Sequence, residues 1–131
     1  MLQGSEWVQQ RLNELEREKL QHEADNRRAH ALTSFLRALN ETEIYYGTLR
    51  NSGKDRDREE ELSRTWIEVS QELCIVDLEL AKRCELKARY WADPVGWSAP
   101  ELENAHITIY EMRAALHKLL DQEKDPRHRR G

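Results

Sequence analysis

No glycine or proline occurs between Ser5 and Tyr46, and this stretch is rich in Glu, Gln, Leu, Arg and Ala. These five residue types are strong helix formers, whereas glycine and proline interrupt helices. The stretch therefore predicts one long helix or two helices in line. The whole chain of 131 residues has Gly 5 and Pro 3, too few for the many turns of an all-β protein. We predict an all-α fold built around a single core.

The N-terminal part of the chain, residues 1–26, carries only a thin apolar seam. A stable coiled coil keeps apolar residues at its a and d positions over three or four heptads, and this seam is shorter. We predict a helical arm with a weak coiled-coil seam that buries little by itself. The seam consists of Val8, Leu12 and Leu15, and polar Lys19 and His22 continue it.

From Ala29 onward the apolar stripe thickens, which predicts that the globular body spans residues 27–122. A polar turn over residues 51–55 separates the first helix from a second one. A break near Asp77, a potential N-cap, separates the second from a third, which Asp93-Pro94 ends. Apolar residues of the three predicted helices include Leu32, Phe35, Leu36, Leu39, Tyr46, Leu49, Leu62, Trp66, Val69, Leu73, Leu80, Ala81, Cys84, Ala88 and Trp91.

Ser98, Pro100 and Glu101 give the clearest local signal in the chain. Serine is a good N-cap, proline suits the first helical turn, and glutamate at the third helical position closes a capping box. We predict one helix from this point to about Gln122. Its seam would be Leu102, Ala105, Ile109, Met112, Leu116 and Leu119.

Four amphipathic helices joined by short connections predict an antiparallel four-helix bundle, with a long first helix that extends N-terminally beyond it. Residues 123–131 have no apolar anchor and several basic side chains, which predicts a disordered basic tail.

The composition indicates which classes of partner the chain can bind and in which cell compartment it folds. The formal net charge of -4 gives no general attraction to nucleic acid or to an anionic membrane, and no apolar run is long enough to cross a bilayer. Cys74 and Cys84 lack the spacing of a zinc site or a disulfide framework, which is typical of thiols in a reducing compartment. We expect a cytoplasmic protein with no cofactor.

Glu103 and His106 have the Glu-x-x-His spacing that carboxylate-bridged di-iron bundles use. Such a site needs a second copy of the motif and further glutamates that face it, and the chain has neither. No metal site is predicted.

Arg113 and His117 lie one helical turn apart and resemble the arginine-histidine pairs of the small helical ribonucleases of the HEPN type. The resemblance covers this pair alone. Three residues separate the two positions instead of four to six, and Ala114 stands where that signature has a polar residue. The resemblance implies an RNA-processing helical domain, whereas the amphipathic pattern of the helix predicts a solvated face.

Basic residues gather on the third predicted helix, beside Tyr90 and Trp91. Basic side chains interleaved with aromatic rings suit phosphate backbones and stacked bases. Glu79 and Glu85 on the same helix can pair with these residues, so a salt-bridged solvent face is the competing interpretation. The possible phosphate-binding residues are Lys82, Arg83, Lys87 and Arg89.

Glu43 falls on the apolar stripe of the first helix, between Leu39 and Tyr46. A buried carboxylate is costly unless it is paired. We therefore expect Glu43 either at the edge of the stripe in water or in contact with an arginine such as Arg64 or Arg113.

These observations favour a non-catalytic helical module for protein-protein interaction or oligomerisation, of which an adaptor or regulatory segment of a larger system is one form. A marginally amphipathic helix gains little in water, so the arm is expected either to pair with another chain, such as an identical copy, or to connect to an upstream domain. The alternative is a nucleic-acid-binding or HEPN-like RNA-processing domain. The expected partner-binding residues are Trp7, Val8, Leu12 and Leu15 of the arm and Trp97, a candidate aromatic anchor. The other interpretation of Trp97 is that it plugs one end of the bundle together with Trp91.

Overall fold

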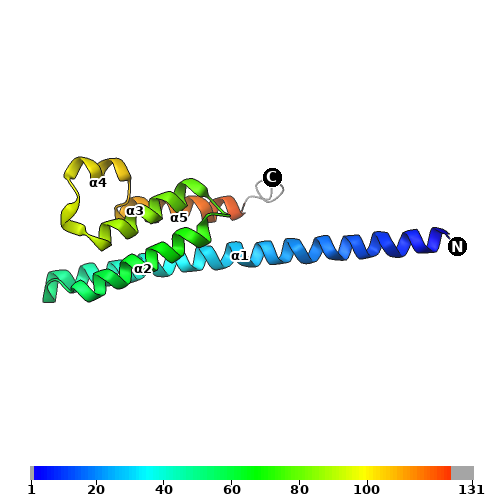
Figure 1. Cartoon of the computed structure of the whole chain (residues 1–131), viewed down its shortest axis with the longest axis horizontal. Coiled ribbons are helices and arrows are strands. Elements are labelled where there is room, and N and C mark those ends of the chain that lie inside the picture. The colour runs from blue at the N-terminus through cyan, green and yellow to red at the C-terminus, as the bar shows by residue number, and fades with distance from the viewer. Residues whose placement is uncertain (1, 125–131) are drawn as a thin grey trace.

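The computed structural model of the chain describes residues 2–124, and these residues form an all-α fold, as predicted. Four helices, α1, α2, α3 and α5, supply the core, and two short elements, η1 and α4, connect α3 to α5 (Figure 1). The elements are α1 (Leu2–Ser52), α2 (Arg56–Leu73), α3 (Leu78–Ala92), the 3-10 turn η1 (Pro94–Gly96), α4 (Ala99–Ala105) and α5 (Ile109–Lys124).

Helix α1 is one uninterrupted helix of 51 residues. Figure 1 shows its N-terminal half, in blue, projecting away from the other helices as a straight rod. The first buried side chain along α1 is that of Ala31, and every described side chain before it is exposed or half-buried. The sequence left open one helix or two in line, and the structure has one.

The core begins where α1 meets the other helices. Trp66, Trp91 and Tyr45 are its largest fully buried side chains, and Phe35 meets the edge of the Trp66 ring at a centroid distance of 6.0 Å. The remaining core residues are Ala31, Leu32, Ala38, Leu39, Leu62, Val69, Leu73, Leu80, Ala81, Cys84, Ala88, Met112, Leu116 and Leu119.

Capping residues set the starts of α2 and α3. The carboxylate of Asp55 accepts a hydrogen bond from the backbone N–H of Arg58 at 3.2 Å, and that of Asp77 accepts one from Leu80 at 3.0 Å. Each satisfies a backbone donor that the first helical turn leaves free. The predicted break near Asp77 is therefore confirmed.

The prediction of one helix from Ser98 to Gln122 was wrong. Ser98 and Glu101 do form the predicted capping box, but α4 ends at Ala105 and His106 takes a left-handed conformation, with φ 54°. The Thr108 hydroxyl then accepts from the backbone N–H of Glu111 at 3.1 Å and starts α5. The Arg83 guanidinium donates to the carbonyl of His106 at 2.7 Å and 3.1 Å, so the carbonyl freed at the break is satisfied.

Helix α1 packs against α2 and α5, and α2 packs closely against α3. The regular antiparallel four-helix arrangement stays a prediction, as does the boundary at residue 26. The predicted disordered tail begins two residues too early, because α5 continues through residues 123 and 124, and the rest of the predicted tail, 125–131, lies outside the described residues. Among the described helices, none has the length and apolar character needed to cross a membrane.

Candidate protein-interaction site

The arm of α1, defined here as residues 4–28, carries the largest group of exposed apolar side chains in the described structure. Trp7, Val8, Leu12, Leu15 and Leu20 are between 44% and 66% exposed. Single exposed apolar residues are ordinary on a protein surface, but five within fourteen consecutive residues of one isolated helix are not. The arm presents an apolar surface that the other described residues leave uncovered.

Local side-chain pairs support the helical conformation of the arm. The amide of Gln9 donates to Asn13 at 3.1 Å, Arg11 forms an ion pair with Glu14 at 3.2 Å, and Gln21 donates to Asp25 at 3.0 Å. Pairs at these spacings add only a few tenths of a kcal/mol each. Because an isolated helix in water is marginally stable, packing of its apolar face would add most of the missing stability.

Three of the predicted partner-binding residues lie on one face of the arm. Val8, Leu12 and Leu15 follow one another at spacings of four and three, so their side chains form one seam. Lys19 continues this seam toward the body. Trp7 lies on the flank of the seam, on the same side as Arg11 and Glu18, whereas Leu20 lies on the opposite flank.

Trp97, the other predicted partner-binding residue, lies far from the arm. It lies in the connection between η1 and α4, and Figure 1 shows α4 at the end of the molecule opposite to the N-terminus. Its side chain is half-buried, and its ring meets that of Tyr90 at 6.3 Å. Trp97 is therefore not part of one surface with the arm, and the fully buried Trp91 belongs to the core.

The four basic residues predicted on α3 do not form one exposed face. Lys87 is only 2% exposed, and the guanidinium of Arg83 is bound to the carbonyl of His106. Arg89 forms an ion pair with Glu85 at 3.0 Å, as the competing interpretation expected. Of the four, Lys82 alone is exposed without a hydrogen bond or ion pair to another described residue.

Lys87 is held among aromatic rings. Its ammonium nitrogen lies 5.4 Å from the centroid of Tyr90, 5.7 Å from Trp91 and 5.9 Å from Tyr46, and 3.4 Å from the Tyr46 hydroxyl. Cation-π attraction offsets part of the cost of burying the charge. The sequence does hold a signal for this burial, because position 87 lies between the core positions Cys84 and Trp91 at helical spacing.

We expect the Lys87→Met variant to have a higher free energy of unfolding than the wild type at pH 7. Burial lowers the pKa of Lys87 from 10.5 to about 8, against a smaller opposite effect of Glu111. Between these two pH values the unfolded wild-type chain binds more protons than the folded one, so its free energy of unfolding rises with pH. The advantage of the variant should therefore shrink by on the order of 3 kcal/mol across this window.

Urea unfolding of both proteins from pH 7 to pH 10 measures this effect. The difference between variant and wild type at each pH cancels the contribution of Cys84, whose pKa burial raises to about 12, and pH 10 stays below the pKa of about 12 to which burial raises Tyr46, the residue in contact with Lys87. Lys82→Met, an exposed change on the same helix, is the matched control. A difference for Lys87→Met that is constant with pH would contradict the expectation.

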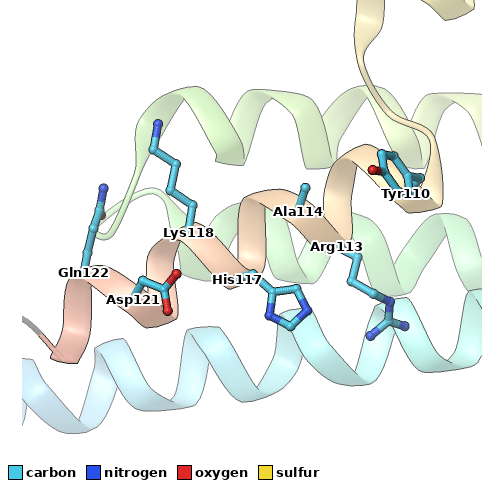
Figure 2. Close-up of a pocket in the computed structure, with 7 residues that line it drawn as sticks. All are labelled: Tyr110, Arg113, Ala114, His117, Lys118, Asp121 and Gln122. Carbon is cyan, nitrogen blue, oxygen red and sulfur yellow. The ribbon is translucent and has the colours of Figure 1, made fainter.

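Arg113 and His117 line a shallow hollow on the outside of α5 (Figure 2). All seven lining residues come from this one helix, so within residues 2–124 no second element closes the hollow. Arg113 points toward α1, where its guanidinium donates to the Glu43 carboxylate at 2.5 Å and 3.0 Å. Glu43 is exposed at the edge of the stripe and also paired with an arginine, so both expectations for it are met.

The Glu-x-x-His spacing of Glu103 and His106 does not create a ligand pair. α4 ends before His106, and the His106 ring lies 2.6 Å from the Glu111 carboxylate instead. Within residues 2–124, no group of three or more His, Cys, Asp and Glu side chains is placed to hold a metal ion.

Glu59 is a second buried charge that the sequence analysis missed. The Tyr45 hydroxyl donates to its carboxylate at 2.6 Å, and Arg56 donates to it at 3.0 Å. Arg56 also donates to the carbonyls of Trp91 and Ala92 at the end of α3. Glu59 precedes the core residue Leu62 by three positions, and this spacing could have indicated its burial. The network joins α1, α2 and α3 and is structural.

The chain matches no protein-family model, no curated protein and no solved structure. The geometry and chemistry of the described residues are therefore the evidence for function.

Proposed function

We propose that this protein is a non-catalytic helical interaction module that associates with another protein chain through its N-terminal arm, and that this chain is a second copy. Such a module would serve as an adaptor or regulatory segment of a larger system. In this proposal, Val8, Leu12 and Leu15 make the central contacts and Trp7 contributes from the flank.

One observation carries the proposal: α1 extends as a continuous helix well beyond the body, and its apolar side chains are exposed along that extension. The core of the body contains no side chain from the arm, because the first buried residue of α1 is Ala31. Helical stability in proteins comes mainly from the packing of an apolar face. Pairing with another chain would supply that packing.

Light scattering after size exclusion tests the proposal. The full chain should have twice the mass of one chain at high concentration and should dissociate on dilution, since the seam is short. A chain that begins at Ala29 should stay at the mass of one chain, with circular dichroism to check that its helices are folded. A full chain with the mass of a single copy at every concentration would contradict self-association.

The nucleic-acid alternative has weaker support. Arg113 is paired with Glu43, and Lys87 is buried, so two of the charges on which this alternative depends are engaged within the chain. The net charge of -4 also opposes binding to a phosphate backbone.

A further inference from the structure

We infer that the arms of two copies pair in antiparallel orientation, with the centre of the pair between Asn13 and Glu14. This inference rests on the proposed function and adds the direction and the register of the pairing. Three features of the arm support it: the order of its apolar residues, the order of its charges, and its length outside the body.

The apolar residues match best in this register. Leu12 faces the partner's Leu15, and by symmetry Leu15 faces the partner's Leu12, so two leucine layers form side by side at the centre. Val8 faces the partner's Lys19 on each side of these layers. The aliphatic part of a lysine can cover valine while its ammonium group reaches water.

The charges beside the seam are complementary in the same register. Arg11 and Glu18 lie on the same flank of the seam, and antiparallel pairing places Arg11 next to the partner's Glu18. Symmetry gives this contact twice. Arg11 and Glu18 are exposed in the single chain, and the ion pair of Arg11 with Glu14 is itself on the surface, so Arg11 can exchange this partner for the partner's Glu18.

Parallel pairing of the same seam brings like charges together. It places Lys19 against the partner's Lys19 within the seam, and Glu18 beside the partner's Glu23 on the flank. Like charges at facing positions of a coiled coil are unfavourable and set the choice of orientation. The favourable contact of Arg11 with the partner's Glu16 offsets only part of this cost.

The length of the arm fits the antiparallel register. In this register Ser5 faces the partner's His22, so the paired segment ends before Arg28 and before Ala31, where α1 enters the body. The seam therefore pairs over its whole length without a collision between the partner's N-terminal end and the body. The centre of the seam also lies near the middle of the free part of α1.

Charge exchange at Arg11 and Glu18 tests the direction of pairing. In the antiparallel pair, Arg11→Glu and Glu18→Arg each replace two attractions with two repulsions, and each should weaken dimerisation about tenfold at low salt. The double variant Arg11→Glu/Glu18→Arg restores opposite charges and should return the dissociation constant to near the wild-type value. Sedimentation equilibrium of the full-length variants measures these constants.

The matched control is Arg17→Glu, the same charge change on the side of the arm away from the seam, which should leave dimerisation unchanged. Tighter dimerisation by Glu18→Arg would overturn the inference, because that change removes a repulsion only in a parallel pair. Failure of the double variant to recover would also overturn it. After either result, a wild-type protein that is still a dimer would support the proposed function without the antiparallel direction. A monomeric wild type would contradict both the proposed function and the inference.

Discussion

The double variant Leu12→Asp/Leu15→Asp is expected to be a monomer at concentrations where the wild type is a dimer. Both leucines are exposed in the single chain, so the change should leave the body folded. In the dimer, four leucine side chains would lose their burial, at about 1.5–3 kcal/mol each, and four carboxylates would face one another. The dissociation constant should rise by more than about 10⁴-fold.

Light scattering at matched concentrations measures this loss, with thermal unfolding to confirm that the body is intact. Leu20→Asp is the matched control, because Leu20 is at least as exposed as Leu12 and Leu15 but lies away from the seam. A double variant that keeps the wild-type mass would show that the arm is not the contact surface. If Leu20→Asp weakened dimerisation as much as the double variant, the arm would pair through a different face.

The second large effect is expected from Trp66→Ala, which should lower the free energy of unfolding by about 3–5 kcal/mol. Trp66 is 0% exposed, packs edge-on against Phe35, and donates its indole N–H to the Thr42 hydroxyl at 3.0 Å. The substitution leaves a cavity between α1 and α2 and leaves the Thr42 hydroxyl without this donor.

Urea unfolding followed by circular dichroism, at one protein concentration for all variants, measures the change. Trp66→Phe keeps most of the ring volume and should cost less than the alanine variant. Trp97→Ala removes a half-buried tryptophan and should also cost less than Trp66→Ala. Equal losses for Trp66→Ala and Trp97→Ala would contradict the placement of the core.

The fold class followed from the sequence because helix signals in this chain are local. The long run without glycine or proline predicted α1, and Asp77 and the Ser98-Glu101 capping box marked real helix starts. The break at His106 was missed because the seam residues keep helical spacing on both sides of it. The Thr108-x-x-Glu111 pattern, a second cap signal, was available within that regular spacing.

The candidate site was partly predictable for a different reason. Exposure of the arm followed from its thin seam, which cannot fill a core alone. The burial of Lys87 and the pairing of Arg113 with Glu43 could not be deduced in the same way, because they depend on which helices meet. A charged residue on an amphipathic helix is usually solvated, and only tertiary contacts identify the exceptions.

Because α1 is continuous from the arm into the body, pairing of the arms would also set the distance between the two bodies. A helix rises about 1.5 Å per residue and resists bending, so a pair centred between Asn13 and Glu14 would hold the two bodies about 50 Å apart, measured between the two Ala31 positions along the shared axis. Each residue inserted between the seam and Ala31 would lengthen that separation by about 3 Å and turn each body by about 100°. The length of the arm would thus set both the distance and the relative orientation of the two bodies and of any domains attached to them.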